Sequence, residues 1–150
     1  GIQSRLNSAN IKLTKDFSDK VRVALDPVRF SQALLNIIEN AIDAMPSGGN
    51  LEVSVRFLCE DKKRPSKTVC TVINPFSMIE IKISDTGAGM DMKTMEKLFT
   101  PFYTTKVNGS GLGMAMVKKI VDLHKGEISI NSKIGSGTEV TIRVPLKIVT

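Results

Sequence analysis

Three segments of the chain alternate strictly between apolar and polar side chains, and this pattern constrains the fold more than any other feature. The segments lie at residues 51–57, 79–84 and 140–144. Because successive side chains of a strand point to opposite faces, each segment predicts a half-buried β-strand. Such strands form a sheet with one apolar face, which another layer must cover. Shorter strands are predicted at 11–16, 21–25 and 128–130.

Two amphipathic helices can supply that layer. Asp26 is a good N-cap and Pro27 suits the first helical position, so the first helix is expected to run from there to about Met45. The second is expected to begin near Leu112 and to stop at Gly126. Several strands are adjacent in sequence, which favours an α+β sandwich in which a mixed sheet carries helices on one face.

Length and composition predict one domain over residues 1–150, with 41% hydrophobic and 24% charged residues. No apolar run approaches the length of a membrane span, and the first residues do not resemble a signal peptide. The start at Gly1 without an initiator Met suggests a fragment of a longer protein. Cys59 and Cys70 belong to no ligand or redox motif, so we interpret them as reduced cytosolic thiols.

The net charge of +6 invites a nucleic-acid interpretation. The dense basic cluster, however, has no interleaved aromatic residue that could stack on bases. We therefore expect a solvated loop or hairpin extension over residues 58–77, and no nucleic-acid partner. The cluster consists of Lys62, Lys63, Arg64 and Lys67.

A stripe of amide and acidic side chains runs along the first helix, opposite its apolar face. Asn36 and Asn40 are four residues apart, and Asp43 follows one turn later. Solvent-facing stripes usually contain Lys, Glu and Arg, and Asn is a poor helix former. Amide and carboxylate oxygens suit Mg²⁺, which keeps several waters and substrate phosphates. The stripe indicates either such a site or an ordinary solvent-facing surface.

The irregular chain from Thr86 to Gly113 is too long for an idle connection. At its start, Asp85 follows a strand and precedes Gly87 and Gly89. An Asp there can accept a hydrogen bond from an exocyclic amine, although the pattern also fits an ordinary turn. At its end, glycines open a helix, where backbone N–H groups favour a phosphate. No strand precedes this second motif and no Walker A sequence occurs, which excludes the Rossmann and P-loop nucleotide sites.

Four motifs, taken in order, resemble the conserved boxes of two-component sensor histidine kinases. Residues 35–45 resemble the N box and residues 85–90 the G1 box, while residues 99–106 resemble the F box and residues 109–113 the G2 box. The wording Asn-Ala-Ile-Asp-Ala-Met and Pro-Phe-Tyr-Thr-Thr-Lys is most similar to the nitrogen-regulation and sporulation kinases. The resemblance spans nearly the whole chain and implies the Bergerat, or GHKL, ATP-binding fold.

The resemblance also implies a role for each motif residue. Asn40 would be the Mg²⁺ ligand, Asn36 would assist at the metal or phosphates, and Asp85 would accept the adenine amine. A mobile ATP lid would span about residues 90–110, with Phe99 and Phe102 anchoring it to the body. The other nucleotide-binding residues implied are Asp43, Gly87, Gly89, Met90, Lys106, Gly109, Ser110, Gly111, Leu112, Gly113 and Thr138.

The function implied is Mg²⁺-dependent transfer of the ATP γ-phosphoryl group to a histidine on a separate dimerisation domain. The single histidine here, His124, stands at a helix end, and we interpret it as a C-terminal cap whose imidazolium complements the helix dipole. The phosphoacceptor is therefore expected outside these residues. The implied partners are the dimerisation helices of the same kinase and the receiver domain of a response regulator. We expect a monomeric isolated domain, a homodimeric full-length protein and a cytoplasmic location, as a free kinase or the cytoplasmic part of a membrane-bound sensor.

Two other functions remain open. A hydrolysing ATPase of the MutL or gyrase kind would carry a Glu one turn before the metal-binding Asn, where this chain has Asn36. Glu39 points about 60° away from Asn36 on the helix, so we expect weak or no hydrolysis. The other alternative is a degenerate nucleotide-binding or docking module that performs no phosphotransfer.

Overall fold

A computed structural model describes residues 2–16, 26–59, 68–69, 78–103 and 111–145. Helices and strands alternate irregularly along this part of the chain. In order, they are α1 (Ile2–Ser8), β1 (Ile11–Asp16), α2 (Pro27–Asp43), β2 (Gly49–Cys59), β3 (Thr68–Val69), β4 (Met78–Asp85), α3 (Met92–Lys97), α4 (Gly113–Leu123), β5 (Glu127–Lys133) and β6 (Gly137–Pro145).

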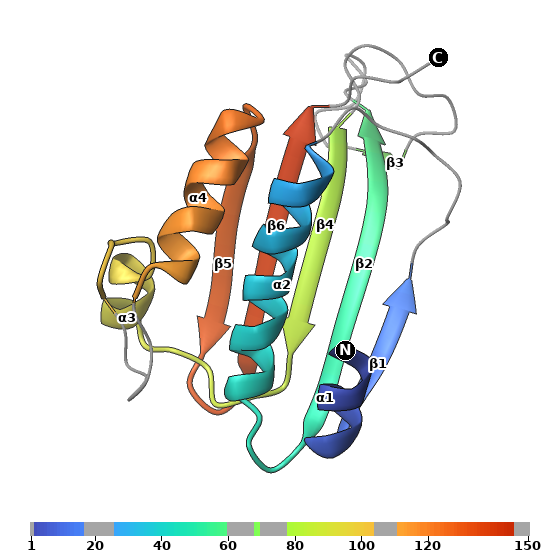
Figure 1. The fold of residues 1–150 in the computed structure, drawn as a ribbon, viewed down its shortest axis with the longest axis vertical. Coiled ribbons are helices and arrows are strands. Elements are labelled where there is room, and N and C mark those ends of the chain that lie inside the picture. The colour runs from blue at the N-terminus through green and yellow to red at the C-terminus, as the bar shows by residue number, and fades with distance from the viewer. Residues whose placement is uncertain (1, 17–25, 60–67, 70–77, 104–110, 146–150) are drawn as a thin grey trace.

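The main strands form one sheet in the order β1-β2-β4-β6-β5, and the short β3 pairs with the end of β2. β1 runs parallel to β2, and every other pairing is antiparallel. Figure 1 shows α2 and α4 side by side on one face of this sheet, with α1 near β1. The predicted mixed sheet with helices on one face is thus confirmed, and most of its strand pairings are antiparallel. No helix within the described ranges is long and apolar enough to cross a membrane.

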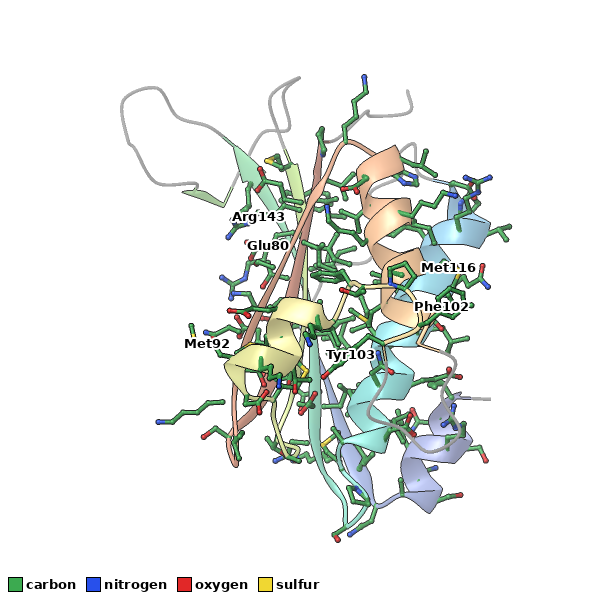
Figure 2. The ribbon with its side chains drawn as sticks, turned by 90° about the vertical axis from the view of Figure 1, so that its left-hand side faces the viewer. Glu80, Met92, Phe102, Tyr103, Met116 and Arg143 are labelled. Carbon is green, nitrogen blue, oxygen red and sulfur yellow. The ribbon has the colours of Figure 1, made fainter. Side chains whose placement is uncertain are left out.

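The alternating segments bury their aliphatic side chains under the helices. Leu51, Ile81 and Ile142 are nearly or fully buried, as are the residues that α2 and α4 turn toward them. The opposite face of the sheet is polar: Glu80 is buried there and accepts a hydrogen bond of 2.9 Å from Arg143 Nε. Figure 2 shows this pair on the side away from the helical layer. The sheet therefore has one covered face, as the alternation requires.

Most predicted elements lie where the sequence places them. The Asp26 carboxylate accepts a hydrogen bond from the Arg29 amide at 3.0 Å, which confirms the N-cap of α2. Of the segment 58–77, the described part extends β2 and adds β3, in keeping with a hairpin extension. The strand predicted at 21–25 lies outside the described residues. The helix α1 had no predicted counterpart, although its Leu6 is fully buried in the core.

The C-terminal stop of α4 differs from the prediction. The residue with positive φ is Lys125, at 56°, and not Gly126. The Gly126 amide donates to the Val121 carbonyl at 2.9 Å, and the Lys125 amide donates to Asp122, which together form a Schellman motif. Gly126 is needed for another reason, because a Cβ there would lie 2.6 Å from the Arg143 carbonyl oxygen.

His124 caps α4, as expected. Its Nε2 accepts a hydrogen bond from the Asp26 amide at 3.2 Å. Its Nδ1 then donates to the Ile120 carbonyl at 2.8 Å, and the ring packs edge-on against Phe30. His124 thus also joins the end of α4 to the start of α2.

Two substitutions test this helix end. We expect Lys125→Gly to raise the free energy of unfolding by about 1 kcal/mol, because glycine adopts positive φ without steric cost. We expect Gly126→Ala to lower it by about 1–3 kcal/mol, because the new methyl group meets a backbone oxygen that cannot move aside. Urea denaturation of both variants measures these changes. Equal destabilisation by the two substitutions would contradict the assignment of the left-handed residue.

Candidate functional site

A cavity of about 540 Å³ opens between the helical layer and the segment that carries α3. Its walls come from the C-terminal half of α2, the N-terminus of α4 with the preceding Gly111, the facing ends of β4 and β6, and residues between Ala88 and Tyr103. The lining residues are Asn36, Ile37, Glu39, Asn40, Ala41, Asp43, Ala44, Ile83, Asp85, Ala88, Gly89, Met90, Thr94, Leu98, Tyr103, Gly111, Gly113, Met114, Thr138 and Val140.

The amide stripe of α2 forms one wall of this cavity. Asn36, Asn40 and Asp43 all line it, whereas Gln32, further up the same stripe, is exposed and lies outside it. The Asn36 Nδ2 atom is buried and has no hydrogen-bond partner within the part of the chain that the structure describes. A Cβ added to Gly113 at the start of α4 would lie 3.9 Å from Asn36 Cγ, so the two helices meet at this amide. A buried N–H donor without an acceptor indicates that a ligand supplies one.

Asp85 closes the other end of the cavity at the end of β4. Its Oδ1 accepts two backbone hydrogen bonds, from the Gly87 amide at 2.9 Å and the Thr138 amide at 3.2 Å. Burial raises the pKa of the Asp85 carboxyl above its usual 3.8, although these two hydrogen bonds act in the opposite direction. Both backbone donors go to one oxygen, which leaves Oδ2 for a ligand.

The loop after Asp85 is held from two sides. The Ala88 amide donates to the Ala44 carbonyl at the end of α2 at 3.1 Å, and the Ala88 carbonyl accepts from the Gly135 amide at 2.8 Å. A Cβ on Gly87 would lie 2.5 Å from the Ala44 oxygen, so Gly87 lets the loop pack on α2 and does not itself line the cavity. Gly89, with φ 73°, lines the cavity and lies against the Lys133 carbonyl.

The turn between β5 and β6 thus supports the site from behind the loop, a role that no sequence pattern indicated. It backs the loop through the Gly135 amide and the Lys133 carbonyl, and Met90 donates from its amide to Ser132 Oγ at 2.8 Å. Only Thr138 in this region had been assigned. A lone Ser in an amphipathic strand carries no sequence signal for such a contact.

Of the lid predicted at about residues 90–110, here called the lid segment, the structure describes residues 90–103. Lys106, Gly109 and Ser110 lie outside the described residues. Gly111 and Gly113 line the cavity, and Leu112, also predicted there, is instead the exposed N-cap residue of α4 outside the lining.

The two predicted lid anchors behave differently. Phe99 packs against the hydrophobic core, as expected. Phe102 is 76% exposed with φ 67°, so its predicted anchoring role is wrong. The positive φ turns its side chain outward, and the following residue, Tyr103, lines the cavity instead. In the view of Figure 2, Phe102 lies over the helical layer, whereas Tyr103 lies between α3 and that layer.

Several lining residues were not predicted. Ile83 and Val140 point into the cavity because they share the helix-facing side of the sheet, a position that alternation could have suggested. Thr94 and Leu98, from α3 and its C-cap, depend on how the lid segment packs, which local patterns do not encode. Ile83, Val140 and Leu98 give the cavity an apolar middle between the polar ends at Asn36 and Asp85.

The carboxylate of Glu39 is held by α1. Its Oε1 lies 2.9 Å from Arg5 Nη1, in a pair whose side chains are both about half exposed. No cluster of three or more His, Cys, Asp or Glu side chains that could hold a metal occurs in the part of the chain that the structure describes. A cation here would need amide oxygens and ligand atoms, a set that suits Mg²⁺.

Comparison with known proteins defines the class. Residues 25–148 match the family model described as histidine kinase-, DNA gyrase B-, and HSP90-like ATPase, so the chain belongs to this family. Within it, the chain is 32% identical over 147 residues to sporulation kinase E of Bacillus subtilis (strain 168), covering 97% of this chain and 18% of that protein. It is 32% identical over 143 residues to sensor histidine kinase ZraS of Escherichia coli (strain K12), covering 95% of this chain and 27% of that protein. The chain thus spans about a fifth to a quarter of the length of these curated relatives.

Solved structures show the same fold. The catalytic domain of histidine kinase ThkA in a nucleotide-free form superposes with a TM-score of 0.74 at 25% identity, covering 96% of this chain and 84% of that one. Full-length ShkA in complex with AMPPNP has a TM-score of 0.76 at 20% identity, covering 99% of this chain and 28% of that one. The architecture is that of histidine kinase catalytic domains, as the motifs implied.

The raised pKa of Asp85 predicts a pH-dependent effect on stability. The folded domain binds the Asp85 carboxyl proton more tightly than the unfolded chain does. The contribution of this proton to the free energy of unfolding is therefore fully present at low pH, and it is lost as the pH rises from about 3.8 through the raised pKa of the folded domain. Asn at position 85 keeps an acceptor for the Gly87 and Thr138 amides but carries no charge. We therefore expect Asp85→Asn to stabilise the nucleotide-free domain at pH 7.

The measurement is chemical denaturation of both proteins at several pH values from 3 to 7. The difference in free energy of unfolding between Asp85→Asn and the wild type should shrink as the pH falls toward 3. Asp16→Asn, at an exposed strand end, is the matched control and should show no such trend. A stabilisation by Asp85→Asn that is constant over this range would contradict the role of burial.

Proposed function

We propose that this chain is the ATP-binding catalytic domain of a sensor histidine kinase, which transfers the γ-phosphoryl group of ATP to a histidine on a separate dimerisation domain. The observation that carries the proposal is one cavity with the half-buried Asp85 carboxylate at one end and, at the other, an amide donor that has no partner among the described residues. Its volume suits a nucleotide-sized ligand. The similarity to named sporulation and sensor histidine kinases supports the same conclusion.

The adenine base is assigned to the Asp85 end. A carboxylate can accept a hydrogen bond from the exocyclic amine of adenine, and Oδ2 is left for that bond. Ile83 and Val140 from the sheet and Leu98 from the lid segment supply apolar contact for a flat ring. Gly89 also lines this end of the cavity.

The phosphates are assigned to the end formed by α2 and the start of α4. The buried Asn36 Nδ2 can donate to a phosphate oxygen. At the N-terminus of α4, where the helix dipole favours an anion, a Cβ on Gly113 would have only one described atom from outside the helix within 4 Å, Asn36 Cγ at 3.9 Å. Asn40, which also lines this wall, is the residue that would hold Mg²⁺ together with phosphate oxygens and water. When bound, the ion neutralises charge on the phosphates.

Phosphoryl transfer needs positioning and charge neutralisation rather than covalent help from this domain. The P–O bond between the β and γ phosphates breaks, ADP leaves, and a P–N bond forms to the acceptor imidazole. His124 cannot be that acceptor, because both its nitrogens are hydrogen-bonded and it caps the end of α4 about 16 Å from the glycines at its start. The acceptor helices and the response regulator receiver domain are the proposed partners, in a cytoplasmic, homodimeric kinase.

A titration of the nucleotide tests the proposal. We expect ADP and ATP to bind the domain one-to-one, and Asp85→Asn to abolish this binding. Asn40→Ala should lower the nucleotide affinity measured with Mg²⁺ by about tenfold or more, because it removes the contribution that depends on the ion. Gln32→Ala, on the same helix but outside the cavity, should not lower it. Isothermal calorimetry with and without Mg²⁺ measures both effects.

Transfer is then assayed by adding radiolabelled ATP and a purified histidine-bearing helix pair from a sporulation-type kinase. Label on the added histidine supports the kinase assignment. Nucleotide binding without transfer to any supplied acceptor would favour a docking module, and a folded domain that binds no nucleotide would overturn the proposal.

The domain alone should hydrolyse ATP very slowly. The position one turn before Asn40 is Asn36, whose amide is no general base, and the nearby Glu39 carboxylate is paired with Arg5. We expect turnover below about one per minute in a phosphate-release assay, unchanged by Glu39→Ala. A rate of several per minute that this substitution removes would contradict the assignment and favour a hydrolysing ATPase.

A further inference from the structure

A hydroxyl that lies outside the cavity contacts two of the residues that line it, Met90 and Thr138. Ser132 on β5 is half-buried and does not line the cavity. Its Oγ nevertheless has three hydrogen-bond partners: the Met90 amide at 2.8 Å, the Gly137 carbonyl at 3.0 Å and Thr138 Oγ1 at 2.8 Å. Thr138 does line the cavity, and it pairs directly with Asp85 across β4 and β6.

The directions of these three bonds follow from the groups involved. An amide N–H can only donate, so Met90 donates to Ser132. A carbonyl can only accept, so Ser132 spends its single proton on Gly137. The remaining contact, between two hydroxyl oxygens, then requires the proton of Thr138. Ser132 thereby accepts two hydrogen bonds and donates one, which fills its capacity.

Thr138 consequently turns only lone pairs of its Oγ1 toward the cavity. Beside it, Asp85 Oδ1 accepts the Gly87 and Thr138 amides, and Oδ2 is likewise an acceptor. Asp85 Oδ2 and Thr138 Oγ1 can therefore both accept a hydrogen bond from a ligand at this end of the cavity. A base with an amine at this position can donate hydrogen bonds to these oxygens. A base with a carbonyl oxygen there would place an acceptor against two other acceptors.

We infer that Ser132 is a positioning residue that sets base selectivity: by fixing the Thr138 hydroxyl as an acceptor, it makes the site favour a 6-aminopurine over a 6-oxopurine nucleotide. The inference rests on the proposed nucleotide site and adds to it the source of discrimination. Ser132 also accepts the Met90 amide, so the same hydroxyl fixes the start of the lid segment relative to the base end.

The test compares binding of ADP and inosine diphosphate, which differ at the 6-position by amine and carbonyl. The wild-type domain should prefer ADP by at least about a hundredfold. Ser132→Ala frees the Thr138 hydroxyl to rotate and donate, so the preference should fall about tenfold. Ser132→Thr keeps the hydroxyl and should retain the preference, as should Ser129→Ala, an exposed control on the same strand. The wild-type domain should also disfavour the O6-methylinosine nucleotide as it disfavours inosine diphosphate. This nucleotide lacks the proton on ring nitrogen N1, so the comparison isolates the effect of the oxygen at the 6-position.

A double-mutant cycle tests whether Ser132 acts through Thr138. Thr138→Val should itself lower the preference for ADP, and Ser132→Ala should cause no further change in that background. If Ser132→Ala weakens ADP and inosine diphosphate equally, or still changes their ratio beside Thr138→Val, the inference is wrong. If Ser132→Ala does not fold, an unchanged preference in Thr138→Val alone overturns it. A folded wild-type domain that binds neither nucleotide would instead refute the proposed function.

Discussion

The register between β4 and β6 is the constraint on which both the fold and the site depend. It places Ile81 opposite Ile142 on the covered face, and at the end of the strands it places Asp85 opposite Thr138. A shift by one residue would turn the aliphatic side chains of β6 to the polar face and would remove the Thr138 amide from Asp85. Because core packing and the site share one pairing, the hydrophobic effect that fixes the sheet also aligns the polar groups.

The residues of the site are not arranged for stability in the empty state. Burial disfavours the charge on Asp85, and the Asn36 Nδ2 donor has no partner. Each feature costs free energy in the unliganded domain, and each would be relieved by a ligand that brings a donor to one end and acceptors to the other. Polar groups poised in this way at the two ends of one cavity are typical of binding sites.

The sequence predicted the features that depend on local periodicity. The amide stripe follows from the helical repeat, so Asn36 and Asn40 could be placed on one wall before the structure was known. Alternation likewise predicted the covered face of the sheet. Where the backbone conformation depends on contacts distant in the sequence, prediction was less successful. Gly126 was expected to stop the helix, whereas the left-handed residue is Lys125 and Gly126 is needed for its contact with Arg143. The anchoring role predicted for Phe102 was wrong and the contacts of Ser132 were not predicted, because their environments come from segments that no local pattern joins.

The turn between β5 and β6 also has a consequence for anyone who modifies this domain. Hairpin tips on protein surfaces are usually the places that accept an inserted peptide. This one packs its backbone on the loop after Asp85, with Gly89 against Lys133 and Gly137 against the Asp85 carbonyl. A longer tip would push that loop away from α2. Ile134, in contrast, is 67% exposed at the same tip, so a single side chain there can carry a fluorophore that reports on the loop without lengthening the turn.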